Sequence, residues 1–311
     1  MDSNSKNNVP NIVYHYTSPS GLLGIVADSE KDRENAKLWF TRWDSLNDKS
    51  ERYDIQEVLK EYKALKGDDI REEFQDAIQE LIDTDVTKWE LHPILWRNNT
   101  NGISSMNLSA PNPDNIYICS FSTDGDSLPM WNYYSKSSHY EGYALGIDVA
   151  KWEERVKELN GCALDIRRVI YDEKDKIKKI DEIVSECEKD LKNESIQKIL
   201  STILGTEYIE QNLSLRIARL QLVFKDKHFS HENEVRVILQ IPKDKKITPK
   251  YRAGNGYIIP YVEVPVPKEA ITSVTVGPLL EKELAKKNVK EMLESRGYSC
   301  KVHTSEVPIR F

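Results

Sequence analysis

The strongest strand signal in the chain is the apolar run at residues 235–241, and two glutamates, Glu232 and Glu234, stand directly before it. A short run rich in valine, isoleucine and leucine is typical of a buried strand. Because side chains alternate along a strand, we expect Glu232 and Glu234 to point to the same side of the sheet. Arg236 shares that face by the same alternation. The run therefore predicts a buried strand that carries a charged, polar end.

A second polar strand is predicted near the start of the chain. Residues 12–17 read Ile-Val-Tyr-His-Tyr-Thr, a β-branched and aromatic run. His15 and Thr17 share one face of this strand, and Tyr16 takes the other. If the strand neighbours the one opened by Glu234, the two would line one cleft with a neutral hydrogen-bonding end and an acidic end. That cleft would suit a ligand with hydroxyls and a developing positive charge. Alternatively, His15 is a core histidine that is hydrogen-bonded to a carbonyl.

Strand patterns dominate both ends of the chain, and helical patterns fill two internal blocks, which is typical of an α+β fold. Further strands are predicted at 37–41, 116–121, 142–149, 162–171, 257–266, 271–276 and 298–303. Helices are predicted at 128–134, where Pro129 opens a short helix, at 213–224 and at 280–293. We predict a disordered lead-in at 1–11 and a single α+β domain at 12–311. Its helical insertions are expected at about 51–98 and 174–225.

Charge and composition exclude several classes of protein. The formal net charge of −7 over 311 residues argues against a broad electrostatic grip on nucleic acid, without excluding a local basic channel. No apolar run approaches the ~20 residues that span a bilayer, and the first eleven residues have no apolar core of a signal peptide. The four cysteines show no Cys-x-x-Cys spacing, which favours thiols of a reducing compartment. These features predict a cytoplasmic protein with no membrane association.

Polar and aromatic residues between the two predicted strands leave alternatives open. Ser120 lies on a predicted strand, and Trp131 and Tyr134 lie three residues apart on a predicted helix. Such aromatic side chains either pack beneath the helix or stack on a ligand. Arg236 can form a buried ion pair with Glu234 or hold a diphosphate bidentately.

His228 and His231 suggest a metal site beside Glu232 and Glu234, but the spacing argues against it. Residues i and i+3 of a strand face opposite sides, so the two histidines would share a metal only on a helix or turn. No metal is therefore expected. The sequence also lacks the glycine-rich nucleotide-binding patterns and the nucleophile elbow of the hydrolases.

Seven short motifs follow one another along the chain. They are Tyr-His-Tyr-Thr at 14–17, Leu-Asn-Asp-x-x-Glu at 46–51, Cys-Ser-Phe-Ser at 119–122, Met-Trp-x-x-Tyr at 130–134, Glu-x-Glu-x-Arg at 232–236, Val-Gly-Pro at 276–278 and Ser-x-x-Pro-x-Arg at 305–310. Taken in order, this series resembles a widespread bacterial family of unknown function that is often found near phage-defence genes. The series covers nearly the whole chain and is specific as a set, although the resemblance by itself implies no activity.

A strand-borne His-x-Thr followed by a helix is also similar to the opening of DarT-type and RNA 2′-phosphotransferase-type members of the ADP-ribosyltransferase fold. The resemblance implies split mixed or antiparallel sheets with helical insertions. It implies that His15 and Thr17 hold a ribose of NAD, and that Glu234 is the catalytic glutamate. Glu232 would be the first member of a Glu-x-Glu pair.

The same resemblance implies that Trp131 or Tyr134 stacks on nicotinamide. From their own positions on the predicted strands, Ser120 and Arg236 are expected to complete the NAD site, with Arg236 on the diphosphate. The expected function is thus an NAD-dependent ADP-ribosyltransferase of an anti-phage defence or toxin-like system, with NAD as substrate.

The acceptor macromolecule, which could be protein, DNA or RNA, is left open, as is the oligomeric state. One alternative is a non-catalytic module that senses a nucleotide or a phage component. The other is a metal-dependent nuclease that uses His228, His231 and the neighbouring glutamates.

Overall fold

The computed structural model describes residues 9–26, 35–46, 51–86, 89, 115–134, 140–160, 164–241, 247–254, 256–279 and 281–308. Most of the Leu-Asn-Asp-x-x-Glu motif, Cys162 at the start of one predicted strand, residues 1–8 of the expected lead-in and Arg310 lie outside the described residues. Residues 9–11 of the lead-in contact the sheet. Val9 packs against the core, and the carbonyl of Asn11 accepts a hydrogen bond from the amide of Val149.

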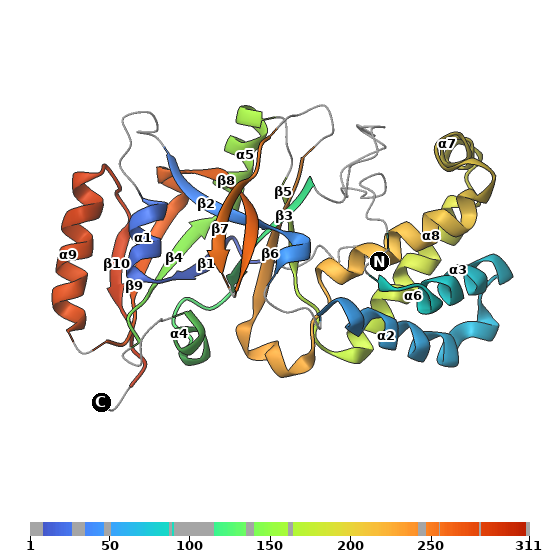
Figure 1. Cartoon of the computed structure of the whole chain (residues 1–311), viewed down its shortest axis with the longest axis horizontal. Helices are drawn as coiled ribbons and strands as arrows, with labels where there is room; N and C mark the ends of the chain where they lie inside the picture. Colours follow the sequence, from blue (N-terminus) through green and yellow to red (C-terminus); the bar gives the residue numbers. More distant parts are fainter. Residues whose placement is uncertain are drawn as a thin grey trace, which may run out of the picture.

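The described strands form one mixed sheet, and the fold combines α and β elements as expected (Figure 1). The strand order is β10-β9-β4-β1-β3-β2-β8-β7, with β6 paired to β3 and β5 paired to β6. Within the described residues only β9 and β10 pair in parallel. The strands are β1 (Ile12–Thr17), β2 (Asn35–Arg42), β3 (Ile116–Ser122), β4 (Tyr143–Asp148), β5 (Leu164–Arg168), β6 (Glu234–Gln240), β7 (Lys250–Gly254), β8 (Tyr257–Pro267), β9 (Ile271–Val276) and β10 (Lys301–Thr304).

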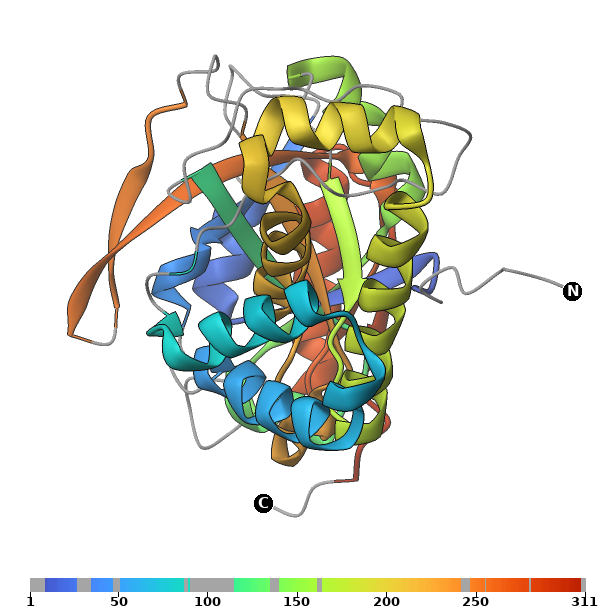
Figure 2. The same cartoon turned by 90° about the vertical axis from the view of Figure 1, so that its right-hand side faces the viewer.

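The helices gather on both sides of the sheet. Helices α2, α3, α6, α7 and α8 lie together at one end of the molecule, and α9 lies at the other (Figure 1). Figure 2 shows the first of these groups from its outer side. The two predicted helical blocks thus pack against each other and share one core. The helices are α1 (Pro19–Ile25), α2 (Glu51–Lys66), α3 (Glu72–Asp83), α4 (Leu128–Tyr134), α5 (Val149–Asn160), α6 (Glu173–Asp190), α7 (Glu194–Leu204), α8 (Tyr208–Ala218) and α9 (Lys282–Ser295).

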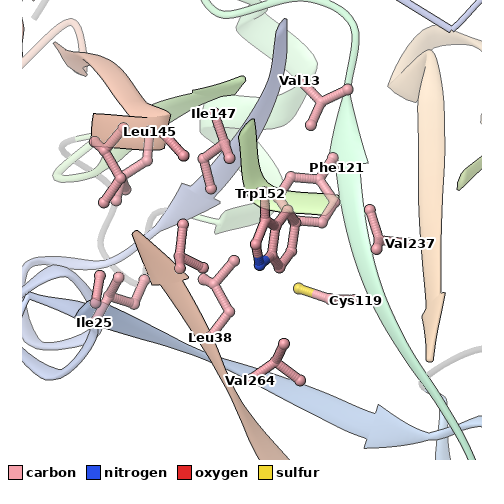
Figure 3. Packing of buried hydrophobic residues seen from close by; sticks show 14 of the residues in the cluster. Val13, Ile25, Leu38, Cys119, Phe121, Leu145, Ile147, Trp152, Val237 and Val264 are labelled. Carbon is pink, nitrogen blue, oxygen red and sulfur yellow. The ribbon is translucent and has the colours of Figure 1, made fainter. Parts of the chain in front are cut away.

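Strand β3 separates two hydrophobic cores because its side chains alternate. Cys119 and Phe121 enter the core that contains Trp152 of α5 (Figure 3), whereas Ile116 and Ile118 enter the core formed with the helical blocks. The burial of large apolar side chains on both faces accounts for the mostly apolar sequence of β3, which is typical of a strand covered on both sides.

One edge of β3 is shared between two strands. Strand β1 pairs with it at Ser122, and β2 pairs with it at Ile118 and Tyr117. The other edge is paired with β6 along its whole length. Between these two pairings, where β1 and β2 diverge, no described residue pairs with Cys119 to Phe121 on the shared edge.

Two described elements have no counterpart in the sequence prediction. Helix α5 follows directly on β4 because the Asp148 carboxylate accepts hydrogen bonds from the Ala150 and Lys151 amides and so caps the helix. Strand β7 is short and largely polar, so it lacks an apolar pattern and forms by pairing with β8. The predicted helix at 213–224 also ends early, since α8 stops at Ala218 and a 3₁₀ turn follows. No described helix is both long and apolar enough to cross a membrane.

Candidate functional site

Ser120 lies on β3 between the residue that pairs with β1 and those that pair with β2. It contacts two of the residues that the sequence singles out. Its carbonyl accepts a hydrogen bond from Nδ1 of His15, at 3.2 Å. Its side chain shares a face of the sheet with Glu234 and helps to lower the pKa of that carboxyl. The carbonyl contact is the one expected if His15 is a core histidine, and it replaces a missing backbone hydrogen bond at this edge.

The environment of His15 fixes its chemical state. Burial lowers the pKa of the His15 imidazole, although the hydrogen bond to Ser120 opposes this effect. The ring is therefore neutral at pH 7. Since a carbonyl can only accept, Nδ1 carries the proton and Nε2 is left as a hydrogen-bond acceptor.

Glu234 lies within a compact cluster of charges, which we call the carboxylate cluster: Lys225, Glu232, Glu234 and Arg236. Arg236 donates through Nε to Oε1 of Glu234, at 2.9 Å, and through a terminal nitrogen to Oε2, at 3.2 Å. Lys225 donates to Oε2 of Glu234 at 3.1 Å and to Glu232 at 2.8 Å. Two cations thus face two carboxylates, and Glu234 is only 5% exposed.

The cluster keeps Glu234 ionised. Burial alone would raise the pKa of this carboxyl, but the charges of Arg236 and Lys225, with hydrogen bonds from Arg236 and Ser120, lower it to about 2. Together Arg236 and Lys225 supply three donors to the roughly four lone-pair positions of this carboxylate. The alternative of a buried ion pair between Glu234 and Arg236 is therefore present in the structure.

Glu232 reaches the same cluster by a different route from the one expected. It ends the 3₁₀ segment η7 (Lys227–Glu232) and does not belong to β6, which begins at Glu234. Asn233 between them adopts a left-handed conformation with φ 46°, which asparagine tolerates better than most residues. The chain reversal at Asn233, not strand alternation, brings both glutamates to Lys225.

Helix α4 places its two aromatic residues differently. Trp131 is 1% exposed, packs edge-on against Tyr16 with ring centroids 4.7 Å apart, and donates to Asp126. Tyr134 is 39% exposed. Burial of its hydroxyl, followed by the charges of Glu234 and Glu232, raises the pKa of Tyr134 well above its ordinary value. Tyr134 is thus the aromatic residue of this pair that a ligand can reach beside the carboxylate cluster.

The strands that carry His15 and Glu234 belong to one sheet, but the side chains leave opposite faces. Tyr14 pairs with Ser122, which in turn pairs with Glu234, so these three residues share a face. His15 and Thr17 alternate to the other face. The two side chains therefore do not line the single cleft that was expected. They lie on opposite faces of the sheet, with β3 between their strands. Since neighbouring strands lie about 5 Å apart, the two backbones are separated by roughly 10 Å.

Two residues of the site carry no signal in the sequence. Lys225 lies nine residues before Glu234, in an apolar context, and it joins the two carboxylates. Tyr171 does not belong to any sequence motif either, yet its hydroxyl accepts a hydrogen bond from the backbone amide of Glu234, at 2.9 Å. Both residues are placed by tertiary packing, so spacing along the chain could not reveal them.

The two histidines of the suggested metal site have other partners. His228 bonds to Asp226, and Nε2 of His231 lies 3.0 Å from the hydroxyl of Tyr133. In the described part of the chain no group of three or more His, Cys, Asp or Glu side chains is placed to hold a metal ion. The nuclease alternative therefore has no ligand set among these residues.

Comparison with known proteins gives one match. A family model described as "Protein of unknown function (DUF2971)" matches residues 130–237. The matched segment includes Tyr134, Lys225 and the carboxylates of Glu232 and Glu234, while His15 lies before it. This finding supports the expected similarity to a family of unknown function over that segment. No curated protein and no solved structure matches the chain.

Proposed function

We propose that the chain is an NAD-dependent ADP-ribosyltransferase whose sheet has the split arrangement of that fold. The observation that supports this best is the position of Ser120, whose carbonyl accepts a hydrogen bond from a neutral histidine and whose side chain helps to lower the pKa of a buried glutamate. Both contacts lie where β1 and β2 diverge from β3. A cofactor that passes around this edge of β3 would meet a neutral hydrogen-bonding group on one face of the sheet and an ionised carboxylate on the other.

Each group has a separate role in the proposed reaction. Nε2 of His15 accepts a hydrogen bond from a ribose hydroxyl, and Thr17, on the same face of β1, offers a second neutral contact. Tyr134 supplies the aromatic plane for nicotinamide, because Trp131 is buried. Glu234 is held ionised at neutral pH, as a group that stabilises a cation must be.

The bond between C1′ of the ribose and the nicotinamide nitrogen breaks, and its electron pair leaves with nicotinamide. Glu234 stabilises the positive charge that develops on the ribose. A lone pair of the acceptor then forms the new bond to C1′, and the acceptor's proton passes to a base, for which Glu232 is the candidate.

During this reaction the ammonium of Lys225 has to bind Glu232 in preference to Glu234. In the structure its ammonium is shared by both carboxylates, which neutralises part of the charge on Glu234. If Lys225 turns fully to Glu232 when NAD binds, one acceptor position of Glu234 becomes available to the ribose. Arg236 remains in place and orients the carboxylate.

The test is nicotinamide release from NAD by wild-type protein and by Glu234→Gln, which keeps the shape and removes the charge. Turnover is expected to fall by about two orders of magnitude or more, the usual scale for one preorganised electrostatic contact. Glu291→Gln is the matched control, because Glu291 is 65% exposed on α9. NAD should raise the melting temperature of the wild type, and His15→Ala should weaken that effect. Unchanged turnover by folded Glu234→Gln protein would reject the assignment.

The carboxylate of Glu234 already accepts hydrogen bonds from Arg236 and Lys225. This favours a second candidate, a non-catalytic module that binds a nucleotide. In that case the cluster holds η7 against β6, and NAD stabilises the protein without being consumed. Stabilisation by NAD without nicotinamide release from the wild type distinguishes this candidate. The placement in a cytoplasmic anti-phage defence or toxin-like system rests on the motif resemblance alone.

A further inference from the structure

Within the described residues, Arg252 is a partly buried cation without a carboxylate partner. It lies on β7, and its terminal NH2 donates to the hydroxyl of Thr41 on β2, at 3.0 Å. Its Nε is buried and meets no hydrogen-bond acceptor in the part of the chain that the structure describes. The neighbouring cation Lys250 is instead paired with Glu263 at 2.8 Å. Charged groups removed from water are normally paired, so the guanidinium of Arg252 calls for an anion.

An aromatic surface lies on the same face of the sheet. Trp39 is 47% exposed, and its ring lies against Tyr261 with centroids 4.5 Å apart. Thr41 pairs with Tyr261 across β2 and β8, so Trp39, Thr41 and Tyr261 share one face. The contact between Thr41 and Arg252 places the guanidinium on that face as well. An exposed indole supported from behind by a second ring is a surface on which a planar base can stack.

This face continues into the candidate site. Thr41 is the cross-strand partner of Ile118, two residues from Ser120 on β3. With about 3.3 Å per residue and about 5 Å between strands, Thr41 and Ser120 lie roughly 8 Å apart. The charge of Arg252 also acts on Cys119, where it opposes the rise in the thiol pKa that burial causes. Through Thr41, Arg252 is joined to the face of the sheet that Ile118 and the Ser120 side chain share.

We infer that Arg252, Thr41 and Trp39 form a subsite for a nucleoside monophosphate, in which Arg252 and Thr41 bind the phosphate and Trp39 stacks on the base. A guanidinium presents donors in a fork that matches phosphate oxygens. In the proposed reaction the subsite receives the AMP half of NAD while the nicotinamide ribose lies at Ser120. That assignment rests on the proposed function, whereas the subsite itself does not.

The experiment measures binding of AMP and of adenosine by titration calorimetry. Arg252→Gln is expected to weaken AMP binding about tenfold or more and to leave adenosine binding unchanged, because adenosine has no phosphate. Trp39→Leu is expected to weaken both ligands about tenfold. Arg71→Gln, an exposed arginine paired with Glu73, is the control for charge. Tyr251→Leu is the control for aromatic area, because Tyr251 is 65% exposed on the opposite face of the β7–β8 hairpin that extends from the body in Figure 2.

Two outcomes overturn the inference: no binding of AMP to the wild type, or equal binding to the wild type and Arg252→Gln. Nicotinamide release from NAD is measured on the same preparations to separate the two proposals. Arg252-dependent AMP binding without nicotinamide release keeps the subsite and removes the proposed reaction. Nicotinamide release that depends on Glu234, without AMP binding, supports the proposed reaction and rejects the subsite.

Discussion

Replacing Glu234 by glutamine should destabilise the protein in a pH-dependent way. The pKa of this buried carboxyl is lowered from 4.5 to about 2. At about 1.4 kcal/mol per pH unit, the ionised group contributes about 3 kcal/mol to the free energy of unfolding at neutral pH. Removing one member of a buried ion-paired group has an effect of about this size. For a chain of this length, the expected fall in melting temperature is roughly 6 °C.

The sign of the pH dependence follows from the lowered pKa. The stabilisation is fully present above pH 4.5 and is lost as the pH falls towards 2, because the unfolded chain takes up the proton first. At pH 3 the contribution of Glu234 falls to about 1 kcal/mol. The gap between wild type and Glu234→Gln should therefore narrow by more than half between pH 7 and pH 3. Thermal unfolding followed by circular dichroism, at constant ionic strength and with Glu291→Gln as control, measures this gap. A gap that is absent at pH 7, or equally large at both values, would refute the reasoning.

Two further predictions concern the core on the opposite face of β3. Trp152 is fully buried, meets Phe40 and Phe121 edge-on and donates a hydrogen bond to the carbonyl of Pro265. Trp152→Ala should therefore lower the free energy of unfolding by about 4 kcal/mol, as measured by denaturant titration. A loss below about 1 kcal/mol would contradict this packing. Burial raises the pKa of Cys119 far above its ordinary value, whereas Cys300 is partly exposed. Mass spectrometry after thiol alkylation at pH 8 should find Cys300 modified well before Cys119, and equal rates would show that the core is open.

The sequence predicts the elements whose pattern is local. Strands β1, β3, β6, β8 and β9 carry continuous β-branched or aromatic runs, and α2, α3, α6 and α7 carry helical periodicity, so burial of one face is visible in each segment. Strand β7 has no such run, because pairing with β8 and not its own composition makes it a strand. Its residue Arg252 is consequently invisible to any pattern search.

The relation between His15 and Glu234 shows the limit for the site. Alternation correctly groups His15 with Thr17, yet it cannot say whether that pair lies on the same face of the sheet as Glu234. The pairing of Tyr14 with Ser122 decides this, and a shift of one residue would move His15 to the face of Glu234. Lys225 presents the same difficulty, since the turn at Asn233 brings it to both glutamates.

The pairing of β3 also has a consequence for how the chain is made. Its long edge is covered only by β6, which ends at Gln240, 118 residues after β3 ends at Ser122. At ribosomal rates of about 5–20 residues per second, this edge waits roughly 6–24 s for its partner. During that interval an apolar segment, Ile116 to Phe121, presents unpaired backbone groups of the kind that drive aggregation. The yield of folded protein should therefore depend on how fast residues 123–240 are translated and on whether a chaperone covers β3 meanwhile.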